Sequence, residues 1–235
     1  MSESAPQFPA PLRGVKGYNA PMAKFLTFLA LLAVSPAAVW AGQPLANIDV
    51  VAIDAGHGDD PGGRRGDALE KGQCVLIAQA LKEIIERENG ASVKTVLTFK
   101  SDAATSQRER AFAANGNGAK VFVSIHGHPA KQQEYGVYVP YAVDEPTSSW
   151  KNAGSRFLSK SVVLAEKLKD SLESGLPGKK YFVGHAPLVM FYGVAMPAVA
   201  IEATEYDSQP ALNPESAAKI AQAIYSGLVE YGKNP

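Results

Sequence analysis

Histidine and carboxylate side chains come at the ends of three apolar segments of the chain. His57 follows one such segment and stands between two glycines, His126 follows a second segment, and Glu202 follows a third. Glu70 opens a long helical pattern, from which its carboxylate can point back toward His57. Two imidazoles and one carboxylate form a common catalytic zinc set, in which water takes the open fourth position. These residue types therefore indicate a zinc site.

Each of these side chains also has a simpler interpretation. A single histidine after a strand, such as His57, is commonly a surface residue or a cap. A carboxylate near the start of a helix, such as Glu70, is favoured there by the helix dipole. Glu202 is harder to explain in this way, because a carboxylate that ends an apolar strand is partly buried and needs a partner. The chemical interpretation therefore depends on whether the fold brings these side chains together.

The pattern of apolar residues predicts how the chain positions these side chains. Strands are expected at 48–54, 93–99, 121–125, 136–141, 187–192 and 198–201, and helices at 69–88, 105–114, 155–174 and 214–231. Strands that alternate with helices predict a single α/β domain, with a mostly parallel mixed sheet of about six strands and helices on both faces. Functional groups of such sheets gather at the carboxyl ends of the strands, which is where the candidate residues stand.

The N-terminal part of the sequence resembles a secretion signal rather than part of a fold. Lys24 provides a positive start, 25–34 is a short apolar run, and Ser35-Pro36 ends it. Val39-Trp40-Ala41 then forms a cleavage site of the small-x-Ala type. The run is too short for a membrane span, which needs about 20 apolar residues. A signal peptide is therefore expected, and the alternative is a retained N-terminal anchor.

This interpretation sets the predicted domain boundaries. Residues 1–41 form an N-terminal extension and signal peptide, and residues 42–235 form the catalytic domain. Residues 1–21 have no core pattern, so either Met22 is the true start or this stretch extends the signal. The mature protein is expected to be exported, periplasmic or extracellular, with no stable membrane span after signal cleavage.

Composition narrows the remaining function classes. The chain has 235 residues with 23 Lys and Arg and 23 Asp and Glu, so it lacks the basic surplus of a nucleic-acid-binding protein. A single cysteine, Cys74, excludes an intrachain disulfide and a cysteine-cluster zinc site. Cys74 lies in an apolar helical pattern, where a buried, inert thiol is expected.

Several motifs, taken in order, resemble a known family. The chain from residue 42 onward is similar to the zinc-dependent N-acetylmuramoyl-L-alanine amidases of the amidase type 3 family of cell-wall hydrolases. The motifs that carry this resemblance are Asp54-Ala55-Gly56-His57-Gly58, Glu70-Lys71, Arg108-Glu109-Arg110-Ala111, Val123-Ser124-Ile125-His126 and Pro197-Ala198-Val199-Ala200-Ile201-Glu202, followed by the helix at 220–231. Five motifs in the same order are a far more specific signal than one.

The resemblance implies a fold, an activity and a set of site residues. It implies an α/β sheet flanked by helices, with His57, Glu70 and His126 as zinc ligands and Glu202 as the catalytic carboxylate. Members of the family cut the amide bond between N-acetylmuramic acid and the L-alanine of the stem peptide, so peptidoglycan is the expected partner. This chain differs from the family pattern at Ala55, where Pro is usual, and near His128, where Asn is usual. It also differs after Glu202.

Four further residues have weaker expected roles. Asp54 is expected either to orient a ligand histidine or to cap the end of its strand. His128 is expected either to touch substrate or to be a plain exposed side chain. His185 is a candidate for lining the cleft, and Glu205 is the fallback base should Glu202 be misplaced.

Two other functions remain open at this stage. The chain could be another exported zinc peptidase or N-acyl amino-acid hydrolase, which would clip peptides that remain attached to the glycan. It could also be a non-catalytic peptidoglycan-binding regulator, although a degenerate relative usually loses one ligand of the metal set. No activator protein is indicated by the sequence.

Overall fold

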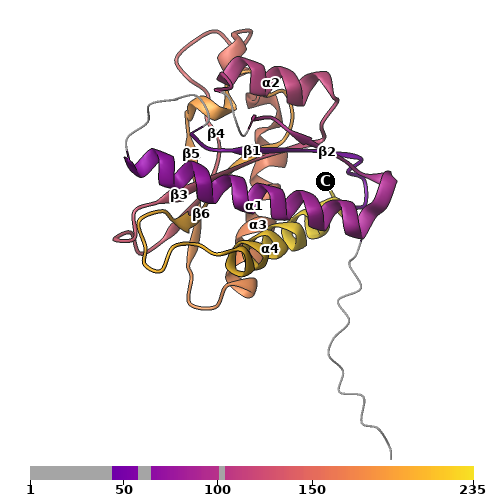
Figure 1. Ribbon diagram of the computed structural model, residues 1–235. Helices are drawn as coiled ribbons and strands as arrows, with labels where there is room; N and C mark the ends of the chain where they lie inside the picture. Colours follow the sequence, from indigo (N-terminus) through magenta and orange to yellow (C-terminus); the bar gives the residue numbers. More distant parts are fainter. Residues whose placement is uncertain (1–43, 58–64, 101–103) are drawn as a thin grey trace, which may run out of the picture. The chain divides into compact units, whose positions relative to one another are not determined.

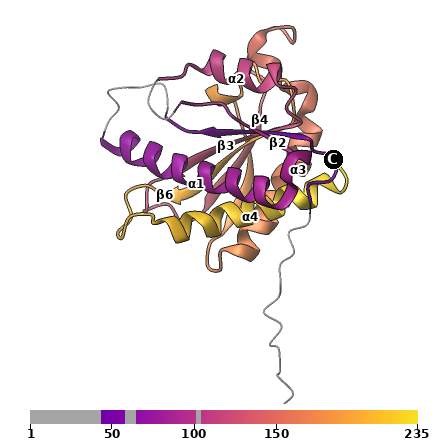
Figure 2. The same cartoon turned by 45° about the vertical axis from the view of Figure 1, so that its right-hand side comes forward.

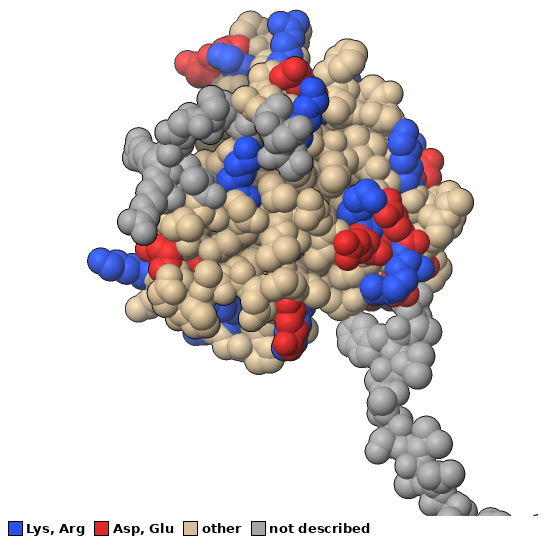
Figure 3. Space-filling model, in the orientation of Figure 1, with Lys and Arg blue, Asp and Glu red and all other residues tan. Residues whose placement is uncertain are grey.

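The computed structural model describes residues 44–57, 65–100 and 104–235. The expected signal peptide and the preceding extension lie outside these residues. Within the described ranges, no helix is both long and apolar enough to cross a lipid bilayer. On the face of the molecule in Figure 3, basic side chains lie interspersed with acidic ones.

A six-stranded mixed sheet forms the centre of the fold, with the strand order β2-β1-β3-β6-β4-β5. The strands are β1 Val50–Ala55, β2 Lys94–Leu97, β3 Val121–His128, β4 Tyr135–Pro140, β5 Tyr181–Ala186 and β6 Ala198–Glu205. Strand β4 runs antiparallel to β6, and the other neighbouring pairs are parallel. The predicted sheet is confirmed, and β1, β3 and β6, which carry the candidate residues, are adjacent in it.

Helices cover both faces of this sheet, as expected. The α-helices are α1 Arg65–Asn89, α2 Gln107–Gly116, α3 Leu158–Gly175 and α4 Pro214–Gly232. Helices α1, α3 and α4 contribute to the larger apolar core on one face, whereas α2 packs on the other (Figures 1 and 2). Short 3-10 helices lie at Gly90–Ser92, Trp150–Asn152, Ser155–Phe157 and Val189–Phe191.

Local signals in the sequence explain where two of the helices begin. Helix α2 starts at a capping box, in which the Ser106 hydroxyl accepts from the backbone of Glu109 and the Glu109 carboxylate accepts from Ser106. Asn213 caps α4 by accepting from the backbone N–H of Ser216, and Pro214 occupies the first helical turn. These caps satisfy backbone donors that the helices themselves leave unpaired.

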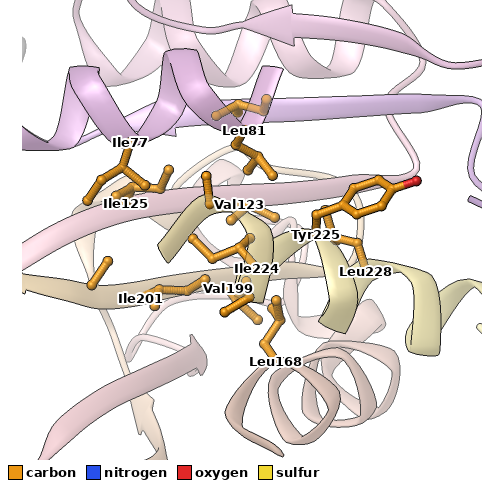
Figure 4. Packing of buried hydrophobic residues seen from close by; sticks show 14 of the residues in the cluster. Ile77, Leu81, Val123, Ile125, Leu168, Val199, Ile201, Ile224, Tyr225 and Leu228 are labelled. Atoms are coloured by element: carbon orange, nitrogen blue, oxygen red, sulfur yellow. The ribbon is translucent and has the colours of Figure 1, made fainter. Parts of the chain in front are cut away.

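The larger core forms between the sheet and helices α1, α3 and α4. Ile125 and Ile201 from neighbouring strands pack against Ile77 of α1 and Ile224 of α4 (Figure 4). Burying each such side chain contributes roughly 1.5–3 kcal/mol to the free energy of unfolding, before the entropy cost of ordering it is subtracted. Cys74 is also fully buried, as predicted, and this burial raises the pKa of its thiol. The core therefore fixes the strands and the start of α1 relative to each other.

One predicted strand is wrong. Residues 187–192 were expected to form a strand, but Val189–Phe191 is a 3-10 helix and the fifth strand is Tyr181–Ala186. A short apolar run does not by itself distinguish a strand from a buried helical turn. Pro187 cannot donate a ladder hydrogen bond, and Phe191 packs into the smaller core beside α2. Helix α1 also begins earlier than predicted.

Candidate metal centre

The structure brings His57, Glu70 and His126 together at the carboxyl edge of β1 and β3. One donor atom from each of the three side chains lies within 4.8 Å of the others. His57 Nε2 is 2.9 Å from Glu70 Oε2, and His126 Nδ1 is 3.6 Å from Glu70 Oε1. Zinc ligands about 2.1 Å from a tetrahedral ion lie about 3.4 Å apart. The spacing of the three donors therefore fits a divalent cation bound among them.

Backbone geometry around Gly56 sets the positions of both histidines. The Gly56 amide donates to the carbonyl of Ile125 at 2.8 Å, which extends the β1–β3 pairing to the edge of the site. A Cβ atom at Gly56 would lie 2.6 Å from the ring of His126, so only glycine fits beneath that imidazole. His57 adopts a left-handed conformation with φ of 59°, which turns the chain sharply after the strand.

Glu70 is held as a charged carboxylate. It is 5% exposed, and the backbone N–H of Gly127 donates to its Oε1 at 2.8 Å. Burial alone would raise the pKa of Glu70, but the nearby imidazoles of His126 and His57 and the hydrogen bond from Gly127 lower this pKa to about 2. An ionised carboxylate between two imidazoles is a suitable ligand for a cation.

Ser124 and Asp54 form a buried chain of hydrogen bonds behind His126. Ser124 Oγ lies 2.6 Å from Asp54 Oδ2 and 3.0 Å from His126 Nε2. The hydroxyl has one proton, and the Asp54 carboxylate can only accept, so Ser124 donates to Asp54 and accepts from the Nε2–H of His126. In a neutral imidazole, a proton held on Nε2 leaves the lone pair on Nδ1, the nitrogen that faces Glu70. This arrangement suits a histidine that would bind a cation through Nδ1.

Asp54 is anchored in turn by two further donors. Thr98 Oγ1 and Arg110 Nη1 each donate to Asp54 Oδ1 at 2.6 Å, and Arg110 Nη1 also donates to the carbonyl of Ala55 at 2.8 Å. Asp54 and Arg110 are 1% and 3% exposed, so this ion pair is buried and ties α2 to the end of β1. Asp54 thus contacts Ser124 rather than a histidine directly. Sequence reasoning did not identify Ser124, Thr98 or Arg110 as supporting residues.

Glu202 lies beside this cluster, opposite His126 in the β3–β6 register. Its Oε2 accepts from the backbone N–H of Gly136 at 2.6 Å and from Gln132 Nε2 at 3.0 Å. Glu202 is not among the three residues whose donors converge, so its position suits a proton carrier rather than a metal ligand. Gln132 and Gly136 lie in and after the β3–β4 loop, and no local pattern in the sequence indicates their role.

Glu205 is engaged elsewhere. Lys179 Nζ and the Tyr135 hydroxyl both bond to its Oε1, and hydrogen bonds from Lys179 and then Tyr135 lower the pKa of Glu205. A carboxylate neutralised by its own lysine is poorly suited to take a proton from water. The structure therefore gives no support to Glu205 as a fallback base.

The two other candidate histidines are not among the three residues whose donor atoms converge. His128 is 1% exposed and packs edge-on against Tyr135 with a ring-centroid distance of 4.2 Å, so the expectation of a plain exposed side chain is wrong. His185 is exposed near the end of β5, beside Tyr141. Because β4 and β5 run opposite to β6, the end of β5 lies away from the carboxyl edge of β3.

Comparisons with known proteins identify the family that the chain resembles. The family described as N-acetylmuramoyl-L-alanine amidase matches residues 51–230. The sporulation-specific N-acetylmuramoyl-L-alanine amidase of Bacillus subtilis (strain 168) is 32% identical over 120 residues, which cover 51% of this chain and 47% of that protein. The chain spans less than half the length of the curated relatives it matches.

Solved structures share the fold. The amidase AmiC2 of Nostoc punctiforme superposes with a TM-score of 0.61 at 22% identity, over 82% of this chain and all of that one. The CwlD amidase of Clostridioides difficile, solved in complex with the GerS lipoprotein, gives a TM-score of 0.51 at 22% identity, over 78% of this chain and 98% of that one. At these identities the likeness shows the architecture.

Proposed function

The chain belongs to the N-acetylmuramoyl-L-alanine amidase family, and from this premise we propose that it hydrolyses the amide between N-acetylmuramic acid and L-alanine in peptidoglycan. We propose that His57, Glu70 and His126 hold a zinc ion and that Glu202 carries the proton. The observation that supports this most directly is the convergence of three donor atoms within 4.8 Å, one strand away from Glu202. Two imidazoles and a carboxylate are a zinc-type donor set that leaves a position open for water.

The chemistry follows from the positions of these residues. When bound, zinc supplies Lewis acidity that lowers the pKa of a water molecule to about 7 and polarises a carbonyl. Glu202 takes one proton from the attacking water and passes it to the nitrogen of the leaving L-alanine. A C–O bond forms at the lactyl carbonyl and the C–N bond breaks, which gives a carboxylic acid on the sugar and a free peptide amine. The acid then loses its proton to the amine or to solvent, which leaves a carboxylate on the sugar.

Gly136 and Gln132 orient the base during this transfer. Both donate to Oε2 of Glu202, which fixes the plane of the carboxylate. Asp54 acts through Ser124 to keep His126 in one tautomer, which is a positioning role.

Export is part of the proposal, because peptidoglycan lies outside the cytoplasmic membrane. The signal-like sequence 22–41 supports removal of residues 1–41 and a mature catalytic domain of 42–235 in the periplasm or outside the cell. N-terminal sequencing of the secreted protein tests this point. A mature chain that retains residues 25–34 would contradict cleavage.

Digestion of purified peptidoglycan tests the activity. We expect the holoenzyme to release free peptides that begin with L-alanine, identified by mass spectrometry, and expect a chelator to stop the release. Glu202→Gln is expected to retain zinc and lose turnover. Shortened peptides that remain attached to glycan would instead favour an exported peptidase. Intact sacculi after incubation with zinc-loaded protein would overturn the proposed activity.

A further inference from the structure

An open trough lies next to Glu202, between the β3–β4 loop and the start of β5. Its volume is about 530 Å³. The residues that line it are Gln132, Gln133, Glu134, Gly178, Lys180 and Phe182. Apart from one glycine and one phenylalanine, every lining side chain is an amide or a charged group.

Gln132 connects this trough directly to the catalytic carboxylate. Its side-chain amide donates to Glu202 Oε2 at 3.0 Å and to the carbonyl of Glu134 at 2.8 Å. The same loop therefore forms one wall of the trough and supports the base. A molecule bound in the trough lies against the residue that positions Glu202.

Phe182 is the aromatic side chain that lines the trough. Phe182 is 36% exposed and meets Tyr138 edge to face, with ring centroids 5.7 Å apart. Two glycines make room for this pair, because a Cβ atom at Gly136 or Gly184 would lie 2.2 Å or 3.0 Å from the Tyr138 ring. Burial, followed by the charge of Glu202, raises the pKa of Tyr138, which agrees with its place beside that carboxylate.

This combination of groups matches the chemistry of a sugar. Side-chain amides both donate and accept hydrogen bonds, as the hydroxyl and acetamido groups of an amino sugar require. An exposed ring offers an apolar face to the C–H side of a pyranose, as aromatic side chains do in other binding sites. The trough is open and carries both signs of charge, from Glu134 and Lys180. A neutral polymer that enters from the side fits it better than a compact apolar ligand.

We propose that this trough is a saccharide subsite that binds N-acetylated sugar rings of the glycan strand, with Phe182 as its stacking residue. The inference rests on the proposed function, since it places the glycan on the β4–β5 side of Glu202. It assigns a binding site to the glycan strand, whose bonds are not broken in the reaction. Binding there orients the lactyl amide toward the metal centre and the base.

Binding of peptide-free glycan tests this assignment without requiring turnover. The ligand is a soluble, uncharged oligosaccharide of N-acetylglucosamine, titrated into zinc-loaded protein and followed by ligand-observed NMR. We expect Phe182→Ala to weaken glycan binding about tenfold, the order expected for loss of a stacking contact. The matched control is Phe112→Ala, because Phe112 is 78% exposed and does not line the trough. Phe182→Trp, which keeps an aromatic face, is expected to retain binding.

The possible outcomes separate the two proposals. Equal glycan affinity of wild type, Phe182→Ala and Phe112→Ala, or no glycan binding by the wild type, overturns the subsite. A matching loss of affinity of Phe182→Ala for the free stem peptide also overturns it, because the effect would not be specific to sugar. Failure of the wild type to cleave peptidoglycan while glycan binding depends on Phe182 would instead refute the amidase activity and leave the subsite in place.

Discussion

Two carboxylates on β6 lie three positions apart and have opposite surroundings. Glu202 accepts hydrogen bonds from two neutral donors, a backbone N–H and a side-chain amide. Glu205 is paired with the ammonium group of Lys179 and with the Tyr135 hydroxyl. Neutral donors orient a carboxylate without cancelling its charge, whereas a lysine cancels it. Glu202 therefore keeps the negative charge that a proton acceptor needs, whereas Glu205 has the surroundings of a structural ion pair.

The same contrast applies to Glu70. It is buried, ionised and surrounded by two imidazoles and a backbone N–H, and among residues 44–57, 65–100 and 104–235 no lysine or arginine forms a salt bridge with it. A buried carboxylate in this environment gains most from a cation that the protein does not itself supply. The group of His57, Glu70 and His126 therefore needs an external cation to balance its charge, whereas Glu205 is balanced by Lys179 of the same chain. Mutations in each group are expected to have different effects.

The largest expected effect is the loss of zinc and activity when one of His57, Glu70 and His126 is replaced. His126→Ala removes one of three ligands, so we expect zinc content well below one ion per chain and peptidoglycan hydrolysis at background level. Elemental analysis and release of L-alanine peptides measure these outcomes. His185→Ala, at an exposed histidine of β5, is the control and is expected to keep both zinc and activity. One tightly bound zinc in His126→Ala would show that His126 is not a ligand.

The next effect compares the two carboxylates of β6 directly. Glu202→Gln keeps the hydrogen-bonding shape but cannot take a proton, so kcat is expected to fall about 10²–10⁴-fold with zinc retained. Glu205→Gln is expected to change kcat by no more than a few-fold. Steady-state kinetics on a soluble muropeptide gives both values. A fall in kcat for Glu205→Gln as large as that for Glu202→Gln would contradict the different roles of the two carboxylates.

A smaller effect is expected from Ser124. Ser124→Ala removes the acceptor of the His126 Nε2–H, so the tautomer with the Nδ1 lone pair loses its support. We expect zinc affinity to fall about 10–100-fold, as for other residues that orient metal ligands, measured by competition with a chromogenic chelator. Ser161→Ala is a matched control, because Ser161 is also fully buried but accepts from the backbone of Ala198. Equal zinc affinity of the two variants would refute the positioning role.

Much of the site follows from the sequence because of one property of parallel sheets. The carboxyl ends of adjacent parallel strands meet at one edge, so side chains at the ends of β1 and β3 had to lie close together. The early position of Glu70 on α1 brought a carboxylate to the same edge. The hydrogen-bonding partners behind His126 could not be identified in this way, because their roles depend on side-chain contacts between elements. These partners are Ser124, Thr98 and Arg110.

The surroundings of His128 and Glu205 have a common cause. The β3–β6 register shifts after His126, so Gly127 pairs with Thr204 and His128 pairs with Glu205. In a continuous register His128 would pair with Thr204. The irregularity places His128 and Glu205 in the cluster with Tyr135, and nothing in the local sequence marks it. A β-bulge of this kind is set by tertiary packing and re-aims the side chains that follow it.

The smallest predicted effect is on the stability that the Glu205 cluster provides. Hydrogen bonds from Lys179 and Tyr135 lower the pKa of Glu205 below its usual value of 4.5. A carboxylate whose folded-state pKa is lowered stabilises the fold above its unfolded-state pKa, and this contribution is lost as pH falls through the folded-state pKa. Lys179 is 40% exposed, so solvent screening limits the contribution to about 1 kcal/mol at most.

Urea unfolding of wild type and Glu205→Gln at several pH values measures this contribution. We expect the wild type to be more stable near pH 7. We expect the difference in unfolding free energy to shrink as pH falls through the lowered folded-state pKa of Glu205, because both side chains are uncharged below that pKa. Lys179→Met is expected to reproduce the loss at neutral pH, since it removes the other charge. A difference that is constant from pH 7 to acid would mean that Glu205 stabilises the fold through packing rather than through its charge. In that case the neutralisation that separates it from Glu202 would no longer explain their different roles.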